Sequence, residues 1–258
     1  MAGRLKGKAA IITGGAGGIG SATGQLFCEE DAKVLLVDRD QSALEEVVKG
    51  IRSSVPSAAV ESLVADVSIE ATASQIVSTA LSAFGRIDAL VNNAGIRAYE
   101  PLSEAKQETW DAILRTNLLS YAWLTREALP HLRASGRGSV VNVSSTHAVN
   151  PRAGMGQYDV AKAGIISMTK TLAFEEAAHG IRANAVCPGL TLTPFHLRRA
   201  EAAGRTRKDL DEEAAGGCLA RRWADPREIA YPILWLASDE ASYITASAIM
   251  VDGGRFVL

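Results

Sequence analysis

The amino-acid sequence of 258 residues predicts an α/β fold built as a doubly wound parallel sheet of about seven strands flanked by helices. Short apolar segments alternate with longer helical patterns along the whole chain. Several of the short segments are apolar at nearly every residue, as strands covered on both faces must be. The expected strands span 8–13, 33–38, 61–66, 87–93, 139–144, 181–188 and 247–254.

Longer helical patterns connect these strands, and they span 18–30, 41–53, 69–84, 108–134, 155–178 and 226–238. No linker rich in proline, glycine or serine separates them, so we expect residues 1–258 to form a single domain. The segment 194–220 interrupts the alternation because it is polar and densely charged. We interpret it as a substrate-binding lid, with a solvated helical excursion as the alternative.

The composition excludes several classes of protein. The net charge is −2 and no basic segment is interleaved with aromatic residues, so nucleic-acid binding has no electrostatic support. No apolar run is long enough to span a membrane, and the N-terminus does not have the pattern of a signal peptide. Three widely separated cysteines indicate free thiols in a reducing compartment, so we expect a cytoplasmic protein. The histidines show no metal-ligand spacing, so no metal is expected.

The sequence TGGAGGIG at 13–20 follows the first expected strand and opens the first expected helix. Glycines at such a turn let the backbone approach a pyrophosphate, whose charge then lies at the helix N-terminus. Two spacings fit, one through Gly15, Gly17 and Gly20 and the other through Gly14, Gly18 and Gly20. Any tight turn from strand to helix favours glycine, but the place of this motif in the first βαβ unit favours a dinucleotide and a Rossmann-like fold.

Asp38 ends the second expected strand and favours NAD as the cofactor. An acid at this position accepts hydrogen bonds from an adenosine ribose and repels a 2′-phosphate. The glycine loop contains no lysine or arginine, which makes NADP less favoured. Arg39 leaves NADP open, because a basic neighbour can turn toward a phosphate; the alternative is an exposed arginine at the strand end.

The segment QYDVAKAG at 157–164 places Tyr158 and Lys162 four residues apart, which by itself only makes them neighbours on a helix. Together with other motifs, this pair resembles the short-chain dehydrogenase/reductase family over essentially the whole chain. The motifs in chain order are TGGAGGIG (13–20), NNAG (92–95), Asn117, SS (144–145), YDVAK (158–162) and PGLTLT (188–193).

This resemblance implies four catalytic residues, Asn117, Ser145, Tyr158 and Lys162. A hydride leaves an alcohol carbon only if the hydroxyl proton leaves as well, and Tyr158 would take that proton. A tyrosine hydroxyl is a poor base at neutral pH, and the ammonium group of Lys162, one helical turn away, would favour its ionised form. Ser145 would hold the substrate oxygen and Asn117 a proton-relaying water. The alternatives are a strand-end cap for Ser145 and a helix-bending polar residue for Asn117.

The resemblance also assigns residues to cofactor binding. Asp66 and Val67 match the dipeptide that contacts adenine, NNAG lies beside the cofactor, and Lys162 would hold the nicotinamide ribose. The expected set is Gly14, Gly18, Ile19, Gly20, Asp38, Asp66, Val67, Asn93, Ala94, Gly95, Tyr158, Lys162, Pro188, Gly189, Thr191 and Thr193.

The C-terminal part of the chain departs from the family pattern at three positions. Ala224 and Ala246 stand where glycine is usual, within RRWADPREIA (221–230) and ASYITASAIMVDGG (241–254). Thr191 stands where an aliphatic residue is usual. We expect these differences to change local backbone freedom and the lining of the pocket, and to leave the catalytic set intact.

The segments expected to wall the substrate site carry polar and cationic side chains. Arg97, His147 and Arg152 are the predicted substrate contacts, with Gln157, Thr191 and His196 on the same walls. This set suits a sugar, a polyol or a hydroxy acid better than a steroid or a long acyl chain. The alternative is that these side chains face solvent, as arginine and loop histidine usually do.

The expected helix 155–178 is apolar or small around much of its circumference, which predicts wide burial. Burial against its own sheet is one explanation, and the family resemblance implies another, pairing with the same helix of a second subunit. The apolar C-terminus RFVL also suggests burial. We therefore predict a homotetramer.

The favoured function is an NAD-dependent oxidoreductase that transfers a hydride between a secondary alcohol and its ketone, with a small polar substrate. A second interpretation is a ketone or 3-oxoacyl-carrier reductase that prefers NADPH, against which Asp38 argues. A third, of another class, is a catalytically silent NAD-binding regulator; such a protein can lack Tyr158 or Lys162, and this chain has both.

Overall fold

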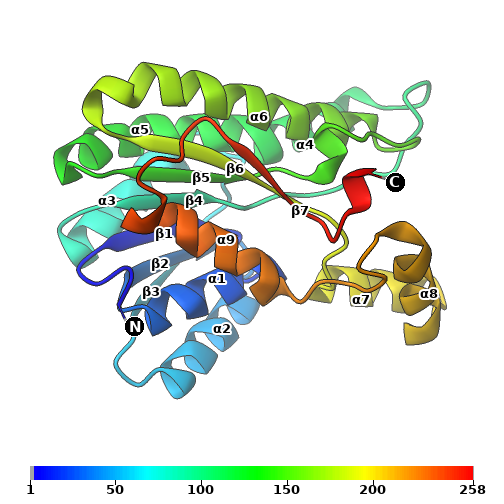
Figure 1. The fold of residues 1–258 in the computed structure, drawn as a ribbon, viewed down its shortest axis with the longest axis horizontal. Coiled ribbons are helices and arrows are strands. Elements are labelled where there is room, and N and C mark those ends of the chain that lie inside the picture. The colour runs from blue at the N-terminus through cyan, green and yellow to red at the C-terminus, as the bar shows by residue number, and fades with distance from the viewer. Residues whose placement is uncertain (1–2, 258) are drawn as a thin grey trace.

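The computed structural model describes residues 3–257, apart from the side chain of Phe256. Seven parallel strands form one sheet in the order β3-β2-β1-β4-β5-β6-β7, which confirms the predicted fold class (Figure 1). The strands are β1 (Ala9–Thr13), β2 (Lys33–Asp38), β3 (Ala59–Val64), β4 (Ala89–Asn92), β5 (Ser139–Val143), β6 (Arg182–Pro188) and β7 (Ala248–Val251).

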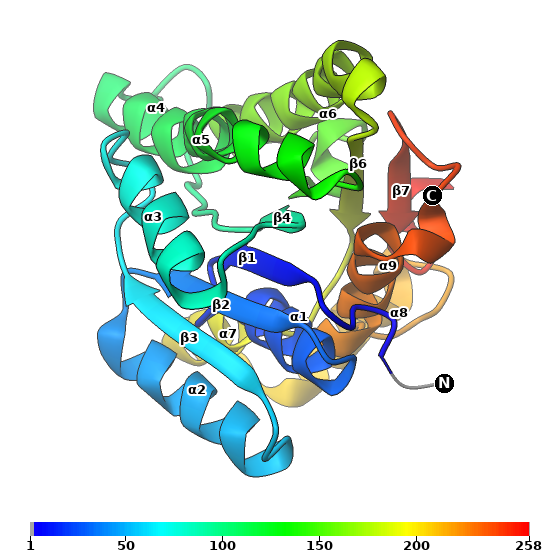
Figure 2. The ribbon, with the colours of Figure 1, turned by 90° about the vertical axis from the view of Figure 1, so that its left-hand side faces the viewer.

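Helices cover both faces of the sheet (Figure 2). The first face carries α1 (Gly18–Glu29), α2 (Gln41–Ser54) and α9 (Pro226–Ala237). The second carries α3 (Thr72–Phe84), α5 (Ser120–Ser135) and α6 (Gly156–Glu176), with α4 (Gln107–Leu114) packed against α6. Two apolar cores result, one on each side of the sheet.

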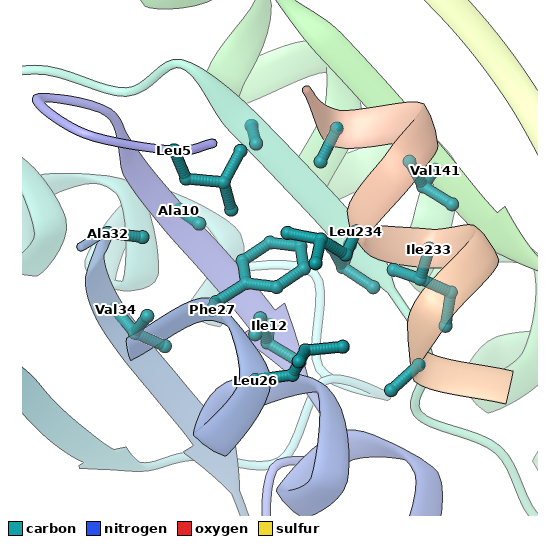
Figure 3. Close-up of a cluster of buried hydrophobic side chains, with 14 of the residues drawn as sticks. Leu5, Ala10, Ile12, Leu26, Phe27, Ala32, Val34, Val141, Ile233 and Leu234 are labelled. Atoms are coloured by element: carbon teal, nitrogen blue, oxygen red, sulfur yellow. The ribbon is translucent and has the colours of Figure 1, made fainter. Parts of the chain in front are cut away.

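Alternation along β1 shows why the strands are apolar at nearly every residue. Ala10 and Ile12 point into the core beneath α1 and α9, whereas Ile11 points into the other core. In the first core Phe27 of α1 lies close to Ile12 and to Leu234 of α9 (Figure 3). Burying one such side chain stabilises the fold by roughly 1.5–3 kcal/mol, so a strand with two buried faces contributes at every position.

The predicted helical stretch over 108–134 is confirmed, and within it the chain forms α4, a π-helical turn over Arg115–Leu119, and then α5. A π turn adds a residue to the helical repeat and redirects the side chains near it. Asn117 lies in this turn, where its amide nitrogen donates to Ile96 O at 2.8 Å and its Oδ1 accepts from Ile96 N at 2.8 Å. Asn117 therefore ties this π-helical turn to the loop after β4.

Several element boundaries also differ from the prediction. β3 begins and ends two residues earlier than expected, so Asp66 lies in the turn beyond the strand. β7 ends at Val251, because Gly253 and Gly254 adopt left-handed φ angles of 61° and 79° that no strand can continue. α3 begins at Thr72, after a turn closed by hydrogen bonds from the Thr72 hydroxyl to the carbonyls of Asp66 and Ile69.

The segment 194–220 forms two helices, α7 (Pro194–Ala202) and α8 (Arg207–Gly217), beside the main body (Figure 1). A capping box between Thr206 and Asp209 begins α8. The segment has a small core of its own, formed by Ala200, Leu210, Ala214 and Trp223. The indole nitrogen of Trp223 donates to Leu210 O at 2.8 Å, which ties α8 to the chain that leads into α9.

Ala224 and Ala246 occupy very different backbones. Ala246 has a φ of +57°, the left-handed conformation that disfavours a side chain with a Cβ. Ala224 has no such φ and instead pairs with the segment after β6: its N–H donates to Leu190 O at 2.8 Å and its carbonyl accepts from Leu192 N at 2.9 Å. The departure from glycine is thus strained at Ala246 alone.

Among the described residues, no helix is both long and apolar enough to cross a membrane.

Candidate active site

The predicted site residues lie at the carboxyl edge of the sheet, in the segments that directly follow the strands. In open α/β sheets ligands bind at this edge, where the strand order reverses. Here the reversal lies between β1 and β4, which pair side by side although two strands separate them in sequence. The glycine loop follows β1 and the NNAG segment follows β4, so the two motifs flank this point.

The glycine loop has no room for side chains. Gly14 has a left-handed φ of +67° and accepts a hydrogen bond from Asn93 Nδ2 at 3.2 Å. A Cβ at Gly20 would overlap the Gly14 carbonyl oxygen, and one at Gly18 would lie 2.9 Å from the Thr193 Cβ. No side chain caps the N-terminus of α1 at Gly17, so the first amides of this helix stay open to an anion. This cradle fits the pyrophosphate of a dinucleotide.

Asp38 lies at the end of β2, next to the glycine loop. One carboxylate oxygen accepts from Ala16 N at 3.0 Å and the other accepts from Asp40 N at 3.2 Å. The residue thus helps to shape the loop, and its carboxylate places negative charge beside it. Arg39 is exposed, as its alternative interpretation expected.

The other predicted adenine-side residues have clear structural roles. Asp66 caps the turn after β3 by accepting from Ser68 N at 2.9 Å, and the side chain of Val67 packs on the second core. Ile19 packs against the first core. These contacts fix the turn after β3 and the start of α1.

The NNAG segment after β4 is held from below by Thr13 at the end of β1. The Thr13 hydroxyl accepts from Asn93 N at 3.0 Å and from Ala94 N at 3.1 Å. From the other side the hydroxyl of Tyr121 donates to Ala94 O, at 3.0 Å. Thr13 and Tyr121 escaped the sequence-based prediction because each acts on backbone that is remote in sequence.

Three of the predicted site residues converge at Gly95. A Cβ there would lie 3.4 Å from Asn117 Oδ1 and 3.6 Å from Lys162 Nζ. Lys162 Nζ donates to Val143 O at 2.8 Å, and the Lys162 carbonyl accepts from the Ser144 hydroxyl at 2.7 Å. Lys162 is therefore held by the end of β5, and Ser144, the first serine of the pair 144–145, contributes one of the two hydrogen bonds.

Tyr158 and Lys162 share one face of α6, with Lys162 Nζ 5.6 Å from the centre of the Tyr158 ring. Tyr158 is only 5% exposed. Burial lowers the pKa of Lys162 to about 7, and the positive charge of Arg97 acts in the same direction. A lysine with such a pKa readily gains or loses a proton near neutral pH, so it can respond to charge that develops on Tyr158.

Ser145 is the second residue after β5 and lies in the same pocket as the predicted substrate contacts. Its Oγ accepts from His147 N at 3.1 Å and begins a 3-10 turn over Thr146–Ala148. Ser145 is thus the cap that its alternative interpretation expected. The hydroxyl proton is not used by that bond, so it remains available to a substrate oxygen.

The PGLTLT segment joins the end of β6 to α7. Pro188 ends β6, and Gly189 N donates to Val251 O at 3.0 Å. Thr193 lies against Gly18, and its hydroxyl is 2.8 Å from His196 Nδ1. Thr191 is buried and forms a bridge with Ala224. Any change of position in α7 therefore reaches the glycine loop through Thr193.

A pocket of about 90 Å³ opens beside Ser145. It brings together the predicted residues Arg97, His147, Arg152, Gly189 and His196. The prediction that Gln157 and Thr191 line this pocket is wrong: both are buried, and Gln157 Nε2 donates to Glu100 Oε2 at 3.2 Å. The other lining residues are Thr146, Leu190, Arg199, Ala200, Ala203, Arg205, Leu210, Glu213, Trp223 and Arg255.

Six of the ten lining residues that sequence reasoning missed lie in the segment 194–220, four of them in α7 and α8 and two in the turn between these helices. The charge density of 194–220 was a signal for this contribution, but the sequence did not show which charges face inward. Arg199 lines the pocket although it is exposed, and its guanidinium carbon lies 4.1 Å from the ring centre of Tyr99. Its neighbour Arg198 is exposed as well but takes no part in the lining.

Comparisons with known proteins agree with this geometry. A family model described as enoyl-(acyl carrier protein) reductase matches residues 14–255. The chain is 39% identical over 254 residues to a 3-oxoacyl-[acyl-carrier-protein] reductase, FabG, of Thermotoga maritima, covering 98% of this chain and 100% of that protein. It is 35% identical over 255 residues to glucose 1-dehydrogenase 2 of Bacillus subtilis, covering 97% of this chain and 95% of that one.

Among solved structures, the chain is similar to L-sorbose reductase from Gluconobacter frateurii, complexed with NADPH and L-sorbose. The TM-score is 0.94 and the sequence identity is 32%, and the match covers 98% of each chain.

Proposed function

Because the chain belongs to the short-chain dehydrogenase/reductase family, whose members act on CH–OH groups with NAD or NADP, we propose that it is an NAD-dependent enzyme. Its substrate pair would be a small polar secondary alcohol and the corresponding ketone. The observation that carries this proposal is that the side chains of Asn117 and Lys162 both lie against Gly95. Lys162 also shares one face of α6 with Tyr158.

The proposed chemistry assigns one task to each side chain. Tyr158 takes the proton from the alcohol hydroxyl during oxidation and returns it during reduction. Lys162 favours the ionised tyrosine through its positive charge, and Ser145 donates a hydrogen bond to the substrate oxygen. Asn117, held by both backbone groups of Ile96, fixes the loop beside this site. The nicotinamide cofactor, when bound, supplies the acceptor or donor of the hydride.

The preference for NAD rests on Asp38, whose carboxylate lies beside the glycine loop and would repel a 2′-phosphate. The alternative is an NADPH-preferring reductase. Two observations favour it: the similarity to a 3-oxoacyl-[acyl-carrier-protein] reductase, and the NADPH in the structure of the similar L-sorbose reductase. The exposed Arg39 is the residue that would serve a phosphate. Kinetics with both cofactors separate the two proposals.

The homotetramer is also a proposal, supported by apolar side chains that a single chain leaves in water. Phe174 on α6 is 82% exposed and Val160 on the same helix is 52% exposed. In the C-terminal RFVL, Val257 is 69% exposed, and Leu258 and the side chain of Phe256 lie outside the described residues. Light scattering at micromolar concentration tests this proposal, and a monomer peak would overturn it.

The central experiment follows reduced nicotinamide by its near-ultraviolet absorbance, with NAD or NADP and a panel of polyols, aldoses, hydroxy acids and cyclic alcohols. Tyr158→Phe should lower kcat by roughly 10²–10⁴-fold with the affinity for cofactor unchanged. Tyr243→Phe is the matched control, since Tyr243 is fully exposed. Cofactor binding without turnover of any alcohol or ketone would instead support a silent regulator. Faster oxidation of hydrophobic ring alcohols than of polyols would contradict the polar substrate.

A further inference from the structure

Positive charge is concentrated in the pocket beside Ser145, although the whole chain has a net charge of −2. Five arginines line this pocket against a single acid among the described lining residues, Glu213. The arginines come from four separate parts of the chain: Arg97 after β4, Arg152 before α6, Arg199 and Arg205 from α7 and the turn after it, and Arg255 near the C-terminus.

The one acid in the lining is already engaged. Glu213 forms an ion pair with Arg205 at 2.9 Å. No carboxylate in the described part of the chain lies within 4.0 Å of a charged nitrogen of Arg97 or Arg152. Arg152 Nε donates to the thioether of Met155 at 3.3 Å, a weak acceptor. Arg97 is half-buried and Arg152 is exposed at the mouth of the pocket, and neither guanidinium group has a carboxylate partner there.

Arg97 lies next to the reacting centre. Its guanidinium carbon is 5.2 Å from the ring centre of Tyr158 and 5.9 Å from that of Phe195. One of its nitrogens is 3.3 Å from His196 Nε2. Because Ser145 opens into the same pocket, a group bound by Arg97 would lie within a few bonds of an oxygen held by Ser145.

The two histidines in the lining add no charge of their own at neutral pH. Burial and the neighbouring arginines lower the pKa of His147 and of His196 to about 4. The mutual repulsion of the arginines is felt most at Arg152, whose pKa is lowered by burial and by Arg255 and Arg97. An anion in the pocket would relieve this repulsion.

We propose that the substrate carries an oxyanion, a carboxylate or a phosphate group, and that Arg97 and Arg152 bind it close to the carbinol carbon. This inference rests on the proposed function, because it names the substrate class of the same site. A guanidinium group binds either oxyanion through two parallel hydrogen bonds, and a neutral hydroxyl offers no such partner. Sugar acids, hydroxy acids and sugar phosphates fit this description, whereas neutral sugars and polyols leave both arginines uncompensated.

The test compares acids with neutral molecules of similar shape. Oxidation with NAD is measured for gluconate against glucitol and for 3-hydroxybutanoate against 1,3-butanediol, with glucitol 6-phosphate as the phosphate arm. The variants are Arg152→Gln, Arg152→Lys and Arg97→Gln. Arg207→Gln is the matched control, because Arg207 is an exposed α8 arginine outside the lining, paired with Asp211. We expect one acid to exceed its neutral counterpart by at least about 100-fold in kcat/KM.

Arg152→Gln and Arg97→Gln should each lower kcat/KM for the acid by about 10- to 100-fold, with Arg152→Lys intermediate and Arg207→Gln without effect. The carboxylate and phosphate arms show which oxyanion is bound. Equal rates for acids and neutral molecules, with Arg152→Gln and Arg97→Gln unaffected, would overturn the inference while the dehydrogenase proposal stands.

A second readout needs no turnover. Gluconate and inorganic phosphate are titrated into the protein, with and without saturating NADH, and the rise in Tm is recorded. Saturating NADH fills the cofactor site, so a rise in Tm that gluconate or phosphate still causes in its presence reports binding in the arginine pocket. A rise that Arg152→Gln removes and Arg207→Gln keeps would support the inference even if no substrate is oxidised. A rise that is absent, or that NADH abolishes, would overturn it.

Discussion

The glycine loop after β1 and the pocket beside Ser145 are built in different ways. The loop is a contiguous stretch, 13–20, whose backbone shape depends on glycines such as Gly14, Gly18 and Gly20, at which a Cβ would clash. The pocket is assembled from segments spread from Arg97 to Arg255, and it works through side-chain charge. Each substitution in the loop should therefore damage the whole motif, whereas the pocket should tolerate changes one arginine at a time.

The largest expected effect tests the loop. Gly20→Ala would push a Cβ into the Gly14 carbonyl oxygen, so the loop must move. We expect at least about a 100-fold loss of NAD affinity in a fluorescence titration, and a loss of about 1–3 kcal/mol of stability in urea unfolding. Gly50→Ala is the control, since Gly50 lies inside α2 with open space around it and should gain up to about 1 kcal/mol. Unchanged NAD affinity in Gly20→Ala would break the comparison.

The next effect concerns Lys162, which is buried against Gly95 and the end of β5. Its pKa is about 7 in the folded protein and ordinarily 10.5, so between these values the unfolded state binds the extra proton. Stability therefore rises with pH through this window, and the cost of burying the charged form is complete below about pH 7. Relative to Lys162→Met, the cofactor-free wild type should gain about 2 kcal/mol or more between about pH 7 and pH 10. Parallel stability curves for the two proteins would contradict this account.

A smaller effect separates charge from shape at Asp38. Asp38→Asn keeps an oxygen that can accept from Ala16 N, so the loop should hold its form. It removes the negative charge, and we expect the ratio of kcat/KM with NAD to that with NADP to fall by about 10- to 30-fold. Arg39→Gln is the companion variant, made in the wild type and in Asp38→Asn. If it lowers kcat/KM with NADP in both proteins, the result supports the NADPH-preferring alternative. An unchanged cofactor ratio in Asp38→Asn would show that the residue only shapes the loop.

The smallest effect uses the two alanines that stand where glycine is usual in the family. Ala246→Gly should relieve the left-handed backbone and stabilise the protein by about 0.5–1 kcal/mol, after the greater flexibility of glycine in the unfolded chain is subtracted. Ala224→Gly has no such strain to relieve and should be neutral or destabilising. Urea unfolding of both variants checks the contrast, and equal shifts would show that φ at Ala246 does not govern stability.

The fold was predictable because its signals are local and periodic. Strands buried on both faces are apolar at nearly every residue, and the glycine loop and the Tyr158–Lys162 pair are short contiguous motifs. The π turn at Asn117 was not predicted, because the segments on both sides of it are helical and the composition of a π turn is not distinctive. Tyr121 and Thr13 escaped detection because they support carbonyl and amide groups far away in sequence.

The pocket was predictable only in part, for a related reason. Arg97, His147 and Arg152 follow motifs whose place at the sheet edge the sequence indicates. Arg199 and Arg255 do not, because nothing in a charged stretch shows which arginine faces inward once it folds. Gln157 failed for the opposite reason: its place at the start of α6 suggested a wall, yet a partner in Glu100 buries it.

The hydrogen bonds between Ala224 and the segment 190–192 hold together the two ends of the excursion that contains α7 and α8. The small core around Trp223 packs these two helices against each other. Residues 193–223 therefore leave and rejoin the main body at adjacent points and carry two of the five pocket arginines, Arg199 and Arg205. Such a unit can be exchanged between enzymes as a cassette. Transplanting it would carry substrate preference to a new host, while the hydride-transfer machinery of that host stays in place.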